Sequence, residues 1–233
     1  MTTVRVLSGG AAQGLVNALA PRFEAETGCT VEGEFGAVGA MAGKLRAGAP
    51  ADLLILTAAL IAELAREGHA APGSAADVGT VHTGVAVRAG DPTPPIGDAS
   101  ALRAALLAAD AIYAPDLALS TAGSHFAKVL ERLGIRNEVA TRLNGFPNGA
   151  TAMRALAAST SARPIGCTQA TEILNTAGVT LAGPLPPGCE LATVYTAAVA
   201  ARAAAPEEAR RLIALLTADA SREMRQRAGF VAA

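Results

Sequence analysis

Apolar residues in this chain gather in short runs separated by amphipathic stretches, a pattern typical of alternating strands and helices. Residues 4–7 suit a buried strand, and the glycine pair at 9–10 follows at once with a tight turn. Apolar side chains then recur at every fourth position over residues 15–23, which predicts a helix that Gly28 ends. The stretch therefore predicts a strand, a glycine turn and a helix in succession.

The same succession recurs along the chain. Further strands are expected at residues 31–35, 52–56, 80–88, 111–114, 164–168, 179–182 and 193–200. Further helices are expected at residues 41–47, 58–66, 99–109, 126–133, 150–158, 170–175, 206–217 and 218–227. Because strands and helices alternate, the sheets should be mainly parallel, with right-handed crossovers through the helices.

Two of the longer strands, at residues 80–88 and 193–200, are interpreted as crossings between two lobes. Residues 1–82 and 196–233 then form lobe 1, and residues 83–195 form lobe 2. The predicted fold class is α/β, with two lobes that are each a mainly parallel sheet flanked by helices, joined by two crossing strands. Such a pair of strands predicts a hinge and a small-ligand cleft between the lobes.

Glycine-rich or hydroxyl-rich turns precede several of the predicted helices. Backbone N–H groups at a helix N-terminus lack intrahelical partners and, with the helix dipole, favour an anion. In a parallel sheet such turns gather beyond the carboxyl ends of the strands. The first turn has neither a dinucleotide fingerprint nor the Lys-Ser/Thr pair of a P-loop. An anion site is therefore predicted, and turns that bind no ligand are the alternative.

The residues expected to bind the ligand lie in these turns. In lobe 1 they are Ser8, Gly10, Ala11, Ala12, Gln13, Gly36, Ala37, Val38, Gly39 and Thr57. In lobe 2 they are Ser120, Thr121, Ala122, Gly123, Ser124, Asn148, Gly149, Gln169 and Thr171. Hydroxyl groups at helix starts either cap the helix or bind a ligand, and both interpretations stay open, although Thr57 is expected to cap.

Two residues of lobe 2 are candidates for acid–base catalysis. His125 is expected at a helix start, and histidine is the side chain whose ordinary titration range suits acid–base catalysis near neutral pH. The alternative is a histidine exposed on the first turn. Glu172 is a candidate general acid or base, and the alternative is a first-turn glutamate that interacts favourably with the helix dipole.

Composition narrows the classes of partner. The chain has 233 residues, is 51% apolar but only 3% aromatic, and carries a net charge of −1. It therefore offers neither aromatic stacking platforms nor a basic stripe, and no nucleic acid is expected. No apolar run reaches transmembrane length, so membrane insertion is not expected. Cys29, Cys167 and Cys189 lack metal-ligand spacing, so free thiols are expected and neither a metal nor a cofactor is predicted.

The first residues lack the basic start, long apolar run and small-residue cleavage site of a secretory signal. The sequence as it stands therefore predicts a cytoplasmic protein, or a periplasmic one if a signal peptide has been removed. An ABC permease is expected as a partner only in the second case.

Several segments carry a family resemblance: VLSGGAAQGLVNALAPRFEAETG, FGAVGAMAGKLRAGAPADLLIL, STAGSHFAKVLERLGI, RPIGCTQATEIL and ALLTADASREMRQRAGF. They resemble type II periplasmic solute-binding proteins, and more closely the molybdate-binding family. In that family two helix-starting serines, second-lobe amides and a tyrosine hold a tetrahedral oxyanion. The serines fall on Ala11 and Val38, the amide on Ala122 and the tyrosine on Gln169. Because several side-chain donors are missing, a carboxylate is favoured over molybdate or tungstate.

The chain is more similar to a divergent branch of this family, with a glycine-rich first turn, the phrase FG-x-x-G and the phrase GPLP. That branch looks like it includes aconitate isomerase, which acts on a small tricarboxylate. The resemblance implies a solute-binding protein that takes a small organic anion through helix N-termini. The alternatives are a cofactor-independent isomerase or lyase on a di- or tricarboxylate, and a molybdate- or tungstate-binding component of an ABC importer.

Overall fold

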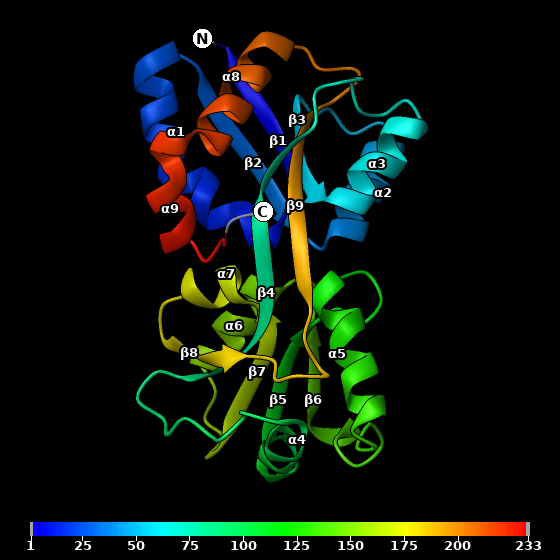
Figure 1. Ribbon diagram of the computed structural model, residues 1–233, viewed down its shortest axis with the longest axis vertical. Coiled ribbons are helices and arrows are strands. Elements are labelled where there is room, and N and C mark those ends of the chain that lie inside the picture. Colours follow the sequence, from blue (N-terminus) through cyan, green and yellow to red (C-terminus); the bar gives the residue numbers. More distant parts are fainter. Residues whose placement is uncertain (1, 232–233) are drawn as a thin grey trace. The chain divides into compact units, whose positions relative to one another are not determined.

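A computed structural model describes residues 2–231 (Figure 1). The chain forms two compact units. Unit 1 comprises the chain up to Val81 and from Thr193 onward, and unit 2 comprises His82–Ala192. The chain leaves unit 1 within strand β4, Ala76–Arg88, and returns to it at the start of strand β9, Ala192–Val199.

Unit 1 is built on strands β1 (Thr3–Gly9), β2 (Thr30–Gly36) and β3 (Leu53–Thr57), which run parallel in the order β2-β1-β3. Strand β9 pairs with β3 in the antiparallel sense. The helices are α1 (Gln13–Thr27), α2 (Val38–Arg46), α3 (Ala58–Arg66), α8 (Pro206–Thr217) and α9 (Arg222–Arg227), with short 3-10 turns at Gly10–Ala12 and Asp219–Ser221. In Figure 1, α1, α8 and α9 lie on one side of the strands, and α2 and α3 on the other.

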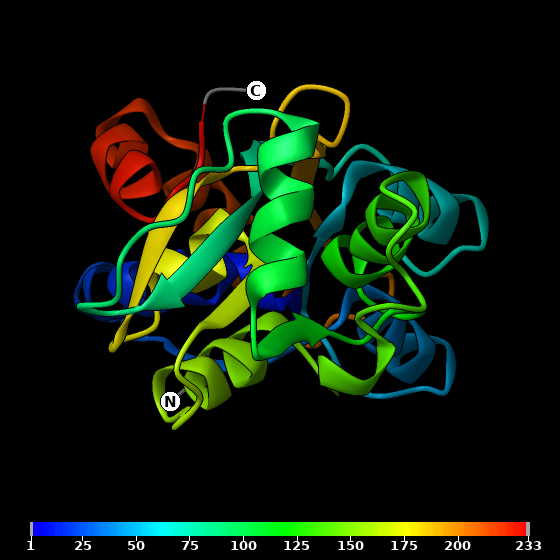
Figure 2. The same cartoon turned by 90° about the horizontal axis from the view of Figure 1, so that it is seen from below.

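Unit 2 is built on parallel strands β5 (Ala111–Pro115), β6 (Leu143–Phe146) and β7 (Pro164–Gln169). Strand β4 pairs antiparallel with β7, and β8 (Val179–Pro184) pairs antiparallel with β4. The helices are α4 (Ala99–Ala108), α5 (Thr121–Arg132), α6 (Gly149–Ala157) and α7 (Ala170–Leu174), with a 3-10 turn at Ala140–Arg142. Figure 2 shows α4 and α6 on different sides of these strands.

The hydrophobic cores fix these helices on their sheets. In unit 1 one cluster joins the buried face of α1, including Leu15 and Phe23, to the apolar strands. Unit 2 has two clusters: α4 and α5 bury residues such as Phe126 in one, and α6 and α7 bury residues such as Met153 and Ile173 in the other. The helices on the two faces of the second sheet are therefore held by separate sets of contacts.

Most of the predicted elements and the α/β class are confirmed, but the sheets are mixed rather than mainly parallel, because β4, β8 and β9 pair in the antiparallel sense. Gly28 ends α1 in the left-handed conformation with φ 69°, which a residue with a side chain adopts at a cost. Thr57 caps α3 as expected, and its hydroxyl oxygen accepts a hydrogen bond from the Leu60 N–H at 3.4 Å.

Three expectations were incomplete. Strand β6 was not predicted, because its LNGF sequence has only two apolar residues and no β-branched residue. Helix α5 begins at Thr121, five residues before the expected start at Phe126, since Ser120 caps it there. Strand β4 begins at Ala76 rather than at Thr80.

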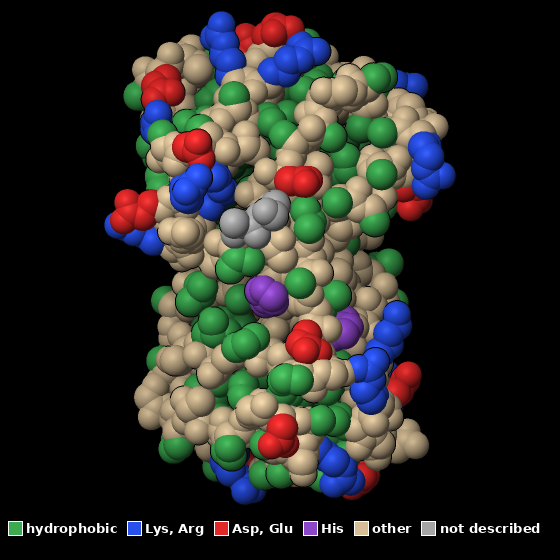
Figure 3. All heavy atoms as spheres, in the orientation of Figure 1, with side chains coloured by type: hydrophobic (Ala, Val, Ile, Leu, Met, Phe, Trp, Pro, Cys, Tyr) green, Lys and Arg blue, Asp and Glu red, His purple; other side chains and the backbone are tan. Residues whose placement is uncertain are grey.

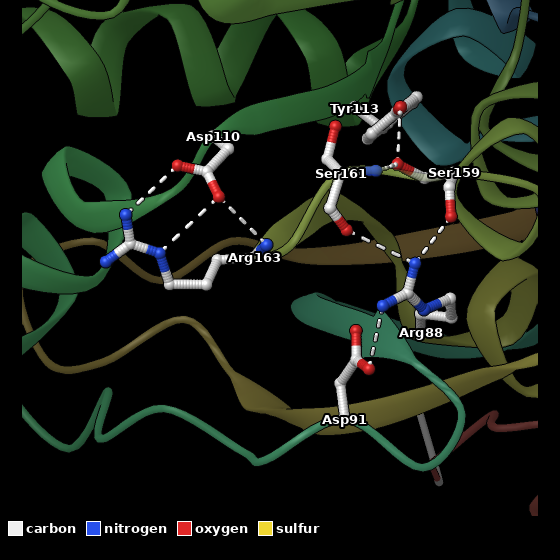
Figure 4. A network of polar contacts seen from close by, with 7 residues as sticks. All are labelled: Arg88, Asp91, Asp110, Tyr113, Ser159, Ser161 and Arg163. Atoms are coloured by element: carbon white, nitrogen blue, oxygen red, sulfur yellow. Dashed lines mark hydrogen bonds and ion pairs between the residues drawn. The ribbon is translucent and has the colours of Figure 1, made fainter.

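A polar network fixes the edge of unit 2 where β7 begins (Figure 4). The Arg163 guanidinium donates to Asp110, 3.0 Å between Nη2 and Oδ1, and this contact holds the pKa of the Asp110 carboxyl below its ordinary value. The Arg88 guanidinium donates to the Ser159 carbonyl at 2.5 Å and to Asp91 at 3.0 Å. The network ties the end of β4 to the loop that leads into β7.

Asp52 is a buried acidic residue with a structural role in unit 1. Its carboxylate accepts hydrogen bonds from the backbone N–H groups of Arg5 at 2.8 Å, Ala204 at 2.7 Å and Ala205 at 2.9 Å. Asp52 precedes β3, Arg5 lies on β1 and Ala205 precedes α8. One carboxylate therefore joins two strands to the start of a helix.

Replacing Asp52 with alanine should lower the free energy of unfolding by about 3 kcal/mol, because three backbone N–H groups lose a buried, charged acceptor. Urea denaturation of the full chain measures this change. The control is Asp219→Ala, which removes an exposed acid that pairs with Arg222 and should leave stability almost unchanged. Equal effects of the two substitutions would contradict the role assigned to Asp52.

Candidate functional site

The predicted ligand-binding residues of unit 1 lie at one edge of its sheet. The strand register pairs Gly9 with Gly36 and Ser8 with Ile55, so the parallel strands β1, β2 and β3 end side by side. The turns into α1, α2 and α3 begin at these strand ends. The unit therefore brings together Ser8, Gly10, Ala11, Ala12, Gln13, Gly36, Ala37, Val38, Gly39 and Thr57.

Gly9 is the most tightly packed position at this edge. A Cβ atom there would lie 2.8 Å from Cγ1 of Val38 and 2.9 Å from Cε1 of Tyr195. Ser8 is fully buried, and its hydroxyl donates to the Gly9 carbonyl at 2.9 Å. Since that proton is used locally, the Ser8 hydroxyl has no hydrogen left to donate, and none of the predicted residues at this edge carries a charge.

The predicted residues of unit 2 lie at the corresponding edge of the second sheet. Helices α5, α6 and α7 begin where the parallel strands β5, β6 and β7 end. Ser120 caps α5, with its oxygen accepting from the Gly123 N–H at 3.4 Å, and Asn148 caps α6, accepting from the Thr151 N–H at 2.8 Å. The Ser120 hydroxyl group therefore caps α5, which is one of the two interpretations that the sequence left open.

The start of α5 packs closely against the loop before it. A Cβ atom on Gly123 would lie 2.1 Å from the Asp116 carbonyl oxygen, so only glycine fits. The Asp116 carboxylate accepts from the N–H groups of Ala118 and Leu119, and these bonds lower the pKa of its carboxyl group. Ser124 donates to the Thr121 carbonyl at 3.2 Å, and Ala122 is buried beside them. This part of the site is rigidly built.

Gln169 and Thr171 carry unpaired polar atoms at the start of α7. Each residue is only 2% exposed. The Gln169 Oε1 atom accepts from the Thr83 hydroxyl at 3.5 Å, but its Nε2 atom has no partner in the part of the chain that the structure describes. The Thr171 hydroxyl likewise has none within residues 2–231. Two buried groups with hydrogens to donate therefore stand two residues apart.

Glu172 is buried, with its carboxyl group surrounded by donors. The Thr168 hydroxyl donates to Oε2 at 2.5 Å, and the nearby N–H groups of Ala150, Gly149 and Gln169 favour the ionised form of the carboxyl group. Burial raises the pKa of Glu172 above its ordinary value, although these donors oppose the shift. Glycine is required at 149, because a Cβ atom there would lie 1.9 Å from Oε2.

His125 is the fifth residue of α5, beyond the helix start at which it was expected because the helix begins at Thr121, and it is half-buried. Its Nε2 atom is 2.8 Å from the Cys189 carbonyl oxygen. Because a carbonyl only accepts, Nε2 carries the proton and Nδ1 of the neutral ring is left as the basic atom. Cys29, Cys167 and Cys189 are free and buried, as expected, and burial raises the pKa of the Cys167 thiol.

The model of one protein family, described as bacterial extracellular solute-binding protein, matches residues 4–231. The chain belongs to this family. Over 222 residues it is 27% identical to an aconitate isomerase from a Pseudomonas species, covering 93% of this chain and 82% of that protein. This similarity supports the predicted placement in a divergent branch.

Solved structures confirm the predicted type II periplasmic-binding-protein fold for this solute-binding protein. The periplasmic molybdate-binding protein of Azotobacter vinelandii superimposes with a TM-score of 0.82 at 19% identity, covering 99% of each chain. PEB3 bound to L-phospholactate superimposes with a TM-score of 0.69 at 14% identity, covering 97% of this chain and 98% of that one.

The surface of the solute-binding protein carries both signs of charge. Figure 3 shows basic and acidic side chains interspersed over the visible face. Many of them form exposed ion pairs, such as Arg46 with Glu63 and Glu67. In the described residues, no helix is long and apolar enough to span a membrane.

Two residues that touch the predicted site were missed in the sequence. Thr168 stands four residues before Glu172, a spacing that joins a strand end to the first turn of the next helix. Thr83 is far from Gln169 in sequence, and only the pairing of β4 with β7 brings the two side by side. The binding and catalytic roles of the predicted residues, and the cleft between the lobes, stay predictions.

Gly9→Ala should lower the free energy of unfolding by about 1–3 kcal/mol, because the new Cβ atom must push Val38 and Tyr195 aside. Thermal denaturation measures the change. Gly43→Ala is the matched control: no atom lies within 4 Å of its Cβ position inside α2, so alanine should stabilise the helix by about 0.5–1 kcal/mol. Two substitutions of the same sign would refute the packing described for Gly9.

The raised pKa of Glu172 predicts a pH-dependent loss of stability. The folded chain keeps the proton at a higher pH than the unfolded chain, whose glutamate pKa is near 4.5. Relative to Glu172→Gln, the wild type should therefore lose stability as the pH rises from 4.5 through the raised pKa. Urea denaturation across this range tests the sign, and Glu131→Gln, on the exposed face of α5, should show no such trend.

Proposed function

We propose that this solute-binding protein binds a small organic anion bearing a carboxylate group, through helix N-termini and the side chains of Gln169 and Thr171. The observation that carries the proposal is the pair of buried donors at the start of α7, Nε2 of Gln169 and the hydroxyl of Thr171. A buried donor without an acceptor costs about 1–3 kcal/mol, and most native donors have a partner. A ligand oxygen would supply the acceptor for both.

The choice of a carboxylate rests on the resemblance to the molybdate-binding family. The two serines of that family fall on Ala11 and Val38, neither of which has a hydroxyl group to donate. Val38 also packs against Gly9, so apolar side-chain atoms occupy this part of the edge. The relative named aconitate isomerase supports an organic acid, while the Azotobacter protein supports molybdate as the alternative anion. An ABC permease is the partner to expect if the protein works in the periplasm.

A cofactor-independent isomerase acting on a di- or tricarboxylate is the second candidate function. It is favoured by the free Nδ1 atom of His125, the fifth residue of α5, together with the similarity to aconitate isomerase. In an allylic isomerisation Nδ1 would take a proton from the carbon next to a carboxylate and return it to the other end of the three-carbon unit. The double bond then shifts by one position, and no atom or electron is gained or lost.

Thermal denaturation with molybdate, tungstate, sulfate, phosphate, citrate, cis-aconitate and trans-aconitate tests the proposal. A ligand that binds the folded state must raise the melting temperature, and we expect the carboxylates to do so. Gln169→Leu and Thr171→Val should each weaken binding about tenfold, the loss expected for one hydrogen bond. Gln226→Leu, an exposed position on α9, is the matched control and should bind as the wild type does. Stabilisation by molybdate alone would contradict a carboxylate ligand.

Proton NMR of the incubated carboxylate separates the two candidate functions. A receptor leaves the ligand unchanged, whereas an isomerase produces the other alkene isomer. In the second case His125→Ala should abolish conversion while ligand-induced stabilisation persists, because the imidazole moves the proton and Gln169 and Thr171 hold the ligand. Full conversion by the His125→Ala variant would exclude His125 as the base.

A further inference from the structure

We propose that Glu172 is a positioning residue: its carboxyl group is an internal acceptor that completes the N-terminus of α6 and holds Gln169 and Thr171 ready for the ligand. The inference rests on the proposed function and assigns a role to one buried acidic residue of that site. It differs from the role of general acid or base expected from the sequence.

The first step is that the protein itself fills the N-terminus of α6. The backbone N–H groups of Gly149 and Ala150, at the first two positions of the helix, act on the Glu172 carboxyl group and hold its pKa down, and Oε2 lies directly against Gly149. At a helix start such N–H groups otherwise need a capping residue, water or a ligand. Asn148 already caps the Thr151 N–H. The first turn of α6 therefore keeps its acceptors within the chain.

The second step is steric. A Cβ atom on Gly149 would lie 1.9 Å from Oε2 of Glu172 and 2.1 Å from the Thr168 hydroxyl oxygen, so the carboxyl group sits directly against the helix backbone. Glu172 is 6% exposed. A ligand group cannot occupy the same position while the carboxyl group is there.

The third step links Glu172 to the ligand donors. The Thr168 hydroxyl donates a hydrogen bond to the carboxyl group of Glu172, four residues later in the chain. This contact spans the corner between β7 and α7. Gln169 and Thr171 lie inside the spanned segment, and the Gln169 N–H is close enough to the carboxyl group to lower its pKa. The Thr83 hydroxyl holds Oε1 of Gln169, which leaves Nε2 as the unpaired end of the amide. The orientation of both donors therefore depends on the Glu172 contacts.

The same contacts argue against proton transfer by Glu172. The Thr168 hydroxyl already donates to Oε2, and the same oxygen atom packs against the backbone of Gly149. A general base must come within hydrogen-bond reach of a substrate proton, and these contacts stand in the way. His125, whose Nδ1 atom stays available, is the basic group left for such a step.

Glu172→Ala in the full chain, with added sodium formate, tests the inference. The substitution leaves a vacancy of carboxylate size at the α6 N-terminus. We expect faster hydrogen exchange at the Gly149 and Ala150 amides and a lower melting temperature, and formate should partly reverse both where sodium chloride at equal ionic strength does not. The wild type should respond to neither salt in this way, because its own carboxyl group fills the position.

Ligand binding gives the readout that a purely structural residue would not move. Glu172→Ala should weaken binding of trans-aconitate by about 10- to 100-fold, the loss typical when a residue that orients binding groups is removed. Glu172→Gln keeps the volume and one carbonyl acceptor, and should fall between Glu172→Ala and the wild type. The matched control is Glu131→Ala, on the exposed face of α5 in the same unit.

The outcomes separate this inference from the proposed function. Unchanged amide exchange in Glu172→Ala, or no response to formate, would overturn the internal-acceptor role and leave carboxylate binding standing. Normal trans-aconitate affinity with lost conversion in Glu172→Gln would instead make Glu172 the base. If the wild type binds no carboxylate, the proposed function fails. The hydrogen-exchange and formate measurements then still decide whether the Glu172 carboxyl group is the acceptor at the N-terminus of α6.

Discussion

Backbone N–H groups at helix starts need acceptors once they are buried, and both units meet this need with an acidic side chain from elsewhere in the fold. In unit 1 the Asp52 carboxylate bonds to the N–H groups of Ala204 and Ala205 just before α8. In unit 2 the Glu172 carboxyl group lies directly against Gly149 at the start of α6, where the N–H groups of Gly149 and Ala150 lower its pKa. Because each acid also reaches a neighbouring strand or strand end, the helices and sheets are fixed together at these points.

The sequence was sufficient to predict those features of the fold that depend on local residue patterns. Apolar periodicity located the strands and helices, and Gly28 marked the end of α1 because a left-handed residue is needed there. The family resemblance and the type II fold are confirmed by the match over residues 4–231 and by the structural neighbours. Strand β6 was not predicted, because its pairing with β5 rather than its own composition makes it a strand.

The site was less predictable, because its side chains act through partners remote in sequence. Capping by Thr57 is local, so a threonine before an apolar helical stretch was enough to indicate it. The contact between Thr83 and Gln169 depends on the register of β4 against β7, which no pattern in either segment specifies. Glu172 was recognised as a residue of interest, but its burial against Gly149 depends on how α6 and α7 pack.

The lack of space at Gly149 has a consequence for how this fold changes over evolutionary time. A side chain at that position meets the side-chain oxygen atoms of Glu172 and Thr168, so a substitution there requires both side chains to shift or to be replaced by smaller ones. The three positions should therefore covary across homologous sequences. A lineage that exchanged all three would open a new cavity at the start of α6, and with it a route to ligands of a different size.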